Sequence, residues 1–144
     1  MAKLPEGHHT ITPGFVVPGV AKLIEFLQTA FGGKVLARYD GPGGAVMHAE
    51  VKIADSVVMM GEPKPPEFPA MPAMLSLYVD DVDGTYKKAL AAGATSKEEP
   101  NNKFYGHRSA RVVDPSGNFW TISKVVEDVS EEELQKRMAA MGHG

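Results

Sequence analysis

The chain has 144 residues, 43% of them hydrophobic, no cysteine and a formal net charge of −3. This length and composition predict one globular domain with its own core, and the lack of cysteine excludes disulfides, thiolate metal sites and cysteine nucleophiles. There is no basic run and no apolar run long enough for a bilayer, so we expect no nucleic-acid partner and no membrane partner. With no signal-peptide pattern at Met1–Gly7, the expected location is cytoplasmic.

The order of predicted elements repeats after about sixty residues. Gly14–Glu62 reads as a strand, a helix and three strands, and Leu75–Lys124 reads the same way. When the two are aligned, Phe15–Val20 falls on Leu77–Val82. A period of this length indicates a duplicated module rather than a solenoid.

The first module, about residues 12–62, is predicted to hold one helix and four strands. Apolar residues recur at three- and four-residue spacing from Val20 to Phe31, which predicts an amphipathic helix that ends at Gly32-Gly33. The predicted strands, with a turn at Asp40–Gly44, are Thr12–Val17, Lys34–Tyr39, Val46–Ile53 and Ser56–Met60.

Five prolines mark Glu62–Pro72. Proline fixes φ and lacks a backbone donor, so residues 62–72 are predicted to form an extended linker between the modules. A proline-rich recognition ligand is the alternative interpretation, but a duplication needs a connector at this place.

The second module, about residues 73–124, is predicted to begin with a strand and a helix capped by Asp80 or Asp81. Asp114–Gly117 fits a type I turn with Asp114 as the acceptor. Ser130–Glu133 reads as a capping box that starts a C-terminal helix, about residues 130–140. The predicted elements of this module are strand Ala73–Val79, helix Val82–Ala92, polar loop Asn101–Gly106, and strands Arg108–Val113 and Asn118–Lys124.

Two βαβββ modules, with Asp114–Trp120 near the end, resemble the vicinal oxygen chelate superfamily, which includes glyoxalase I, extradiol dioxygenases and bleomycin-resistance proteins. Val46–Glu50, Asp55–Met59 and Arg108–Pro115 resemble its PhnB-like branch more closely. The resemblance implies an α+β fold of two curled sheets, with helices on their convex sides and a cavity between the modules. It also implies a homodimer that pairs modules around shared cavities.

Alternation along the strands predicts which side chains face that cavity. Phe15 and Val17 suit the helix side, as do Trp120 and Ile122. The inward residues are then Thr12, Gly14, Val16, Phe119, Thr121 and Ser123.

Metal enzymes of the resembled superfamily place four ligands on their inner strands, usually His, Glu, His and Glu. The corresponding residues are Thr12, Met59, Met74 and Thr121, and none supplies the imidazole or carboxylate that a divalent metal needs. We therefore expect no metal and no cofactor.

Two interpretations of the histidines stay open. A non-standard metal site could use His48, Glu50 and His107, whereas the simpler interpretation makes His48 and Glu50 a hydrogen-bonded pair on a polar strand face. His8 and His9 are expected in a solvated lead segment.

The functional hypothesis is a metal-independent protein of the glyoxalase/bleomycin-resistance-like class that sequesters an apolar or aromatic small molecule. Methionine is deformable and polarizable, which suits such a ligand. No catalytic residue is predicted, because Ser109 and Ser123 lack an oriented base. One alternative is a metal-dependent lyase, isomerase or dioxygenase with His48 and Glu50 as ligands, and another is a scaffold whose dimer surface is its function. The predicted cavity is lined by Thr12, Met59, Met74, Phe119 and Thr121, with polar contacts from His48, Glu50, Tyr105 and Arg108.

Overall fold

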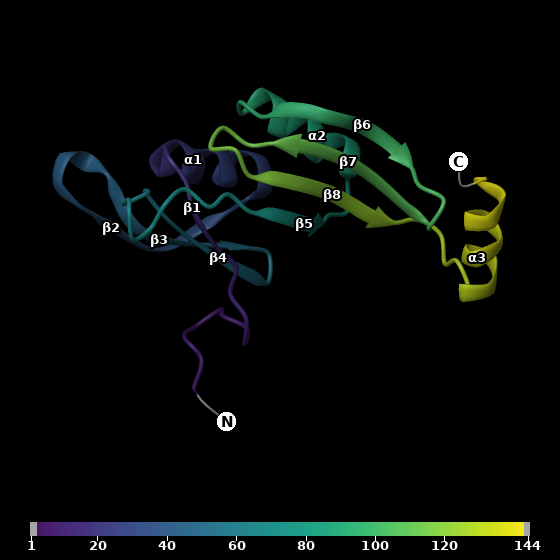
Figure 1. The fold of residues 1–144 in the computed structure, drawn as a ribbon, viewed down its shortest axis with the longest axis horizontal. Helices are drawn as coiled ribbons and strands as arrows, with labels where there is room; N and C mark the ends of the chain where they lie inside the picture. The colour runs from purple at the N-terminus through teal and green to yellow at the C-terminus, as the bar shows by residue number, and fades with distance from the viewer. Residues whose placement is uncertain (1–2, 143–144) are drawn as a thin grey trace.

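The computed structural model describes residues 3–142 and contains two four-stranded mixed sheets and three α-helices (Figure 1). The first sheet has the strand order β1-β4-β3-β2 and the second has the order β5-β8-β7-β6. In each sheet the first strand of the module runs parallel to the last, and the other pairings are antiparallel. The predicted α+β duplication is therefore confirmed.

The observed elements follow the predicted order closely. The first module comprises β1 (Gly14–Val16), α1 (Val20–Phe31), β2 (Lys34–Asp40), β3 (Val46–Ile53) and β4 (Ser56–Gly61). The second comprises β5 (Met74–Tyr78), α2 (Val82–Ala91), β6 (Thr95–Asn102), β7 (His107–Val113) and β8 (Phe119–Val125), and it is followed by α3 (Glu131–Ala140). No helix within residues 3–142 is both long enough and apolar enough to cross a membrane.

Two predicted elements differ from the structure by more than one residue at an end. The polar loop expected at Asn101–Gly106 is shorter, because β6 continues to Asn102, which pairs with Arg108. The first strand is only Gly14–Val16, since its pairing with β4 ends there.

The helices α1 and α2 contact each other and pack against the convex faces of the sheets. Val17, Ala49 and Val51 of the first module and Val112 and Ile122 of the second are completely buried in one shared core. The concave faces of the sheets are curled but not closed on each other. A pocket of about 600 Å³ lies between the two modules and is lined by residues of β3, β4, β5 and β8, but its lining includes neither Met59 nor Met74.

The linker 62–72 contacts the first module at both of its ends. Glu62 accepts hydrogen bonds from the backbone N–H groups of Gly19 (2.9 Å) and Val20 (3.0 Å). These groups open α1, which has no N-cap side chain of its own, so the Glu62 carboxylate satisfies donors that the helix leaves free. Further along, Met71 and Val16 exchange two backbone hydrogen bonds, 2.7 and 3.2 Å long, and so cover the free edge of β1.

Asp114 is the buried centre of the second module. One carboxylate oxygen accepts from the N–H groups of Ser116 (2.9 Å) and Asn118 (3.0 Å). The other accepts from the Asn118 side chain (3.0 Å) and from the Trp120 indole N–H (2.8 Å). The Asn118 side chain in turn accepts from the N–H of Ala73, at the start of β5 (2.9 Å). The predicted turn acceptor is confirmed, and its contacts reach three strands.

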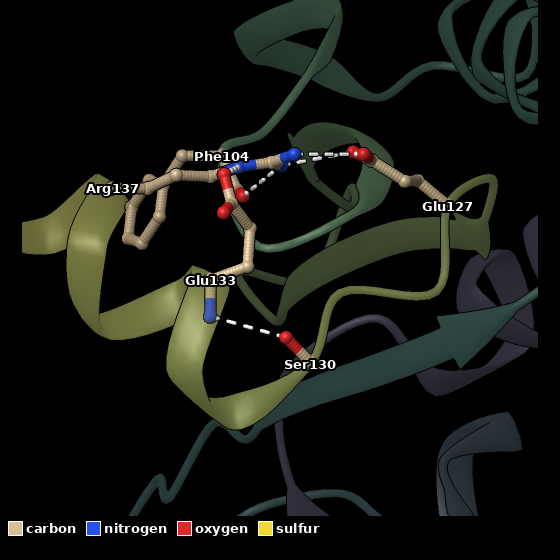
Figure 2. Close-up of polar contacts among 5 residues, drawn as sticks. All are labelled: Phe104, Glu127, Ser130, Glu133 and Arg137. Atoms are coloured by element: carbon tan, nitrogen blue, oxygen red, sulfur yellow. Dashed lines mark hydrogen bonds and ion pairs between the residues drawn. The ribbon is translucent and has the colours of Figure 1, made fainter.

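The C-terminal helix α3 stands apart from both sheets and buries no residue within residues 3–142 (Figure 1). Figure 2 shows how it is held: Arg137 donates to both oxygens of Glu127 (2.9 and 2.7 Å) and to the carbonyl of Phe104 (2.9 Å). Hydrogen bonds from Arg137 lower the pKa of Glu127. The Ser130 hydroxyl accepts from the Glu133 N–H (3.1 Å), so the predicted N-cap is confirmed.

We expect Asp114→Ala to lower the free energy of unfolding by about 3 kcal/mol, because it leaves several buried donors, including the Trp120 indole, without an acceptor. Asp55→Ala is the matched control, since Asp55 is exposed in the equivalent hairpin of the first module. Urea unfolding followed by tryptophan fluorescence measures both. Equal stability of the two variants would contradict the structural role of Asp114.

Candidate functional site

A pocket of about 500 Å³ lies on the concave face of the first sheet. Its wall is mainly apolar and comes from β1, β3, β4 and the linker. The residues that define it best are Val16, Met47, His48, Met59, Lys64 and Phe68, and we call it the first-sheet pocket.

A bulge in β3 helps to shape this pocket. Tyr39 of β2 pairs with His48 and Asp40 pairs with Val46, so Met47 has no partner across the ladder. Beyond the bulge, Ala49 and Val51 point into the core, and His48 and Glu50 alternate with them onto the concave face.

A chain of hydrogen bonds crosses this face. The Glu50 carboxylate binds Nε2 of His48 (2.9 Å) with one oxygen and Nε2 of His8 (2.8 Å) with the other. Nδ1 of His8 lies 2.9 Å from the Thr12 hydroxyl. Because an ionised carboxylate only accepts, both imidazoles donate from Nε2, and in the tautomer of His8 with its single proton on Nε2 the Nδ1 atom accepts from Thr12. His48 also stacks on the ring of Tyr39, at a centroid distance of 6.2 Å.

These contacts test the histidine predictions. The His48–Glu50 hydrogen bond is confirmed. The solvated position expected for His8 is wrong, because its side chain is only 7% exposed and is held by Glu50, whereas His9 is exposed. Hydrogen bonds from His48, and next from His8, lower the pKa of Glu50 against the opposing effect of burial.

The residues do not fit the metal that metal-dependent members of the resembled superfamily hold. Across residues 3–142, no group of three or more His, Asp or Glu side chains is arranged to bind a metal ion. The alternative site with His107 does not form, since His107 lies on the second sheet beside the rings of Tyr78 and Tyr105, at centroid distances of 5.8 and 5.0 Å.

The concave face of the second sheet carries three rows of paired residues. Met74 pairs with Phe119, and Tyr78 pairs with Ser123. The row between them crosses all four strands of the sheet. It consists of Ser76 on β5, Thr121 on β8, Arg111 on β7 and Glu98 on β6, each paired with the next. Met74 is 79% exposed and Tyr78 is 61% exposed, so much of this face is open in the single chain.

The predicted site residues fall into two groups. Thr12, His48, Glu50 and Met59 belong to the concave side of the first sheet. Met74, Tyr105, Phe119 and Thr121 belong to the second. One chain therefore does not bring Met59 and Met74 to a common pocket.

Arg108 lies with neither group. It donates from Nε (2.8 Å) and Nη2 (3.0 Å) to Asp83 of α2, so its side chain is on the helix side of β7. The physical reason is strand alternation: Arg108 shares its face with Ala110 and Val112, which are buried in the core.

Sequence reasoning missed Met47, Lys64, Phe68 and Arg111. The first three depend on the bulge and on the return path of the linker, which carry no local signal. Arg111 could have been found, because an arginine that alternates with buried Ala110 and Val112 must face inward.

Comparisons with known proteins identify the family. A model of the Glyoxalase/Bleomycin resistance protein/Dioxygenase superfamily matches residues 8–122. The chain belongs to this superfamily. A protein of Mycobacterium bovis, described as uncharacterized, is 31% identical to it over 93% of this chain and 95% of its own length.

Solved structures agree with the fold. TioX from Micromonospora sp. ML1 superposes with a TM-score of 0.65 at 23% identity, covering 83% of this chain and 98% of TioX. TnmS3 from Streptomyces sp. CB03234, an antibiotic binding protein, gives 0.62 at 25% identity, covering 82% of this chain and 99% of TnmS3.

The depressed pKa of Glu50 predicts a pH-dependent contribution to stability. We expect Glu50→Gln to lower the free energy of unfolding by about 1 kcal/mol at neutral pH. A carboxylate whose pKa is lowered by folding stabilises above its unfolded pKa, and this stabilisation is lost as the pH falls through the folded pKa. The difference between wild type and variant should therefore stay constant near neutral pH and shrink as the pH falls below the ordinary glutamate pKa of 4.5 in urea unfolding. Glu25→Gln, at an exposed position of α1, is the control, and a pH-independent difference for Glu50→Gln would contradict the assignment.

Proposed function

We propose that the protein is a metal-independent binding protein that sequesters an apolar or aromatic small molecule in the first-sheet pocket. The observation that carries the proposal is the pocket itself, which is lined by the apolar side chains of Met47, Met59 and Phe68 together with His48. Small-molecule sites commonly combine a mostly apolar wall with a few fixed polar groups. The finer assignment to the PhnB-like branch and a cytoplasmic location are part of this proposal.

Two further points support it. The superfamily metal positions carry Thr12, Met59, Met74 and Thr121, whose side chains are poor ligands for a divalent metal. TnmS3, with the same fold and 25% identity, is an antibiotic binding protein, which makes ligand capture a reasonable activity for this chain as well.

The proposal includes a homodimer in which the second sheet of one chain lies over the first-sheet pocket of the other. Met74 and Tyr78 are large apolar side chains left mostly exposed on the second sheet, and Phe68 is 53% exposed beside the first-sheet pocket. Patches of this kind favour burial against a partner. A second chain would supply the facing wall that a single chain lacks.

A metal-dependent lyase, isomerase or dioxygenase is the alternative, and the convergence of His8, Glu50 and His48 is the observation that favours it. In the observed geometry the imidazoles direct their Nε2 atoms at the carboxylate rather than at a common point. One tightly held ion per chain in elemental analysis, lost in Glu50→Gln, would support the enzyme instead.

We expect Met59→Glu to weaken binding of planar aromatic compounds by about tenfold or more, because an unpaired carboxylate in an apolar site is costly or takes up a proton. Met59→Leu keeps volume and polarity and should bind like wild type. Isothermal titration calorimetry, repeated after dialysis against a chelator, measures affinity and metal independence together. Equal binding by Met59→Glu, or binding abolished by the chelator, would contradict the proposal.

The dimer makes a sharper prediction. If each site combines Met59 of one chain with Met74 of the other, Met59→Glu and Met74→Glu should each abolish binding. Refolding the two variants together should restore about a quarter of the sites. The reason is that half of the dimers are then mixed, and each mixed dimer has one intact site among its two. Light scattering checks that the mass is dimeric. No recovery in the mixture, or a monomeric mass, would count against shared sites. Met138→Glu, on α3, is the control that should bind normally.

A further inference from the structure

Arg111 is a charged side chain that the fold leaves without a full set of partners. Its Nε atom is buried and has no hydrogen-bond partner among residues 3–142. A buried donor without an acceptor is unfavourable, and such groups in native proteins commonly mark a bound ion, water or ligand.

The neighbours of Arg111 extend the polar character across the whole sheet. Thr121 on β8 and Ser76 on β5 continue its row. Both lie on the concave face, because the residues that alternate with them pack into the core: Trp120 and Ile122 on β8, and Leu75 and Leu77 on β5. A guanidinium beside two hydroxyl groups is a set of donors suited to a carboxylate or phosphate.

Glu98, the neighbour on the other side, does not fill this role. Its carboxylate is bound to Lys103, and this hydrogen bond is the main cause of its lowered pKa, with a smaller contribution from the charge of Arg111. The guanidinium is therefore only partly compensated within the chain.

The surroundings of the row specify the rest of the ligand. On one side lie Met74 and Phe119, and on the other lies Tyr78, whose neighbour His107 contacts Tyr105. The Tyr78 row also carries the hydroxyls of Ser123 and Ser109, which are hydrogen-bonded to each other (3.2 Å). A guanidinium flanked by Met74 and Phe119 on one side and by the Tyr78 ring on the other matches a flat apolar body that carries one acidic group.

We propose that Arg111, Thr121 and Ser76 form an anion-binding subsite on the concave face of the second sheet, and that the sequestered ligand is an aromatic carboxylate. This inference rests on the proposed binding function for the apolar part of the ligand. The anion subsite itself can be tested without it.

The first test uses benzoate alone. The Arg111 Nε–H resonance, identified by its loss in Arg111→Gln, is followed by nitrogen–proton NMR while sodium benzoate is added at constant ionic strength. We expect a saturable shift with benzoate and none with benzamide or chloride. No shift with benzoate, for example because a carboxylate of a second chain already occupies Arg111, overturns the subsite.

The second test compares 2-naphthoate with its neutral match, 2-naphthamide, by calorimetry. Wild type should prefer the carboxylate by about tenfold or more, as expected for charge-assisted hydrogen bonds in a partly desolvated site. Arg111→Gln should remove this preference while it keeps the affinity for the amide, and thermal unfolding verifies that the variant is folded. Lys97→Gln, which removes an exposed cation of β6 outside both proposed sites, is the matched control and should retain the preference.

The outcomes separate the two proposals. Equal affinities in wild type, or a preference that persists in Arg111→Gln, overturn the anion subsite and leave the binding function standing. If wild type does not bind 2-naphthamide but benzoate shifts Arg111, the proposed apolar binding fails and the anion subsite stands.

Discussion

The buried carboxylate of Asp114 is the contact on which the second module depends. A charge in a core is tolerated only when its oxygens are fully hydrogen-bonded, and Asp114 receives four donors from three residues. One of these donors, Trp120, lies against Phe31 of α1 at a centroid distance of 4.9 Å. The turn between β7 and β8 therefore also fixes the Trp120 ring, which contacts the first module. Because Trp120 faces the core, the residues that alternate with it on β8 face the concave side.

The two modules share a backbone plan but are secured by different polar contacts. In the first module the equivalent hairpin residue, Asp55, is exposed. Other carboxylates make the organising hydrogen bonds there: Glu62 of the linker binds the N–H groups at the start of α1, and Glu50 binds His48 on the concave face. Glu50 pairs with Met59 in the first sheet, just as Arg111 pairs with Thr121 in the second. Duplication has thus placed opposite charges at corresponding positions of the two concave faces.

Most of the fold could be predicted from sequence because helix periodicity, strand alternation and turn residues are local signals. The helix faces, the Asp114 turn and the Ser130 cap follow from such signals. The repeat implied a strand after α2, but the range of β6 could not be predicted, because its sequence is polar and its backbone pairs only with β7. The position of His8 also could not be predicted, since the contact that buries it spans 42 residues. Arg108 and Arg111 differ from each other only by strand parity, and this parity decides which one binds α2 and which one faces the concave side.

The concave faces of the two sheets carry different polar groups. A divalent metal needs imidazole or carboxylate ligands that converge on one point, and within residues 3–142 no group of three or more His, Asp or Glu side chains is arranged in this way. On the first sheet, the Glu50 carboxylate is held in hydrogen bonds with His8 and His48. On the second sheet, the Nε atom of Arg111 finds no hydrogen-bond partner among residues 3–142. This difference is the reason why we propose that the acidic group of the ligand binds the second sheet and that its apolar body binds in the first-sheet pocket.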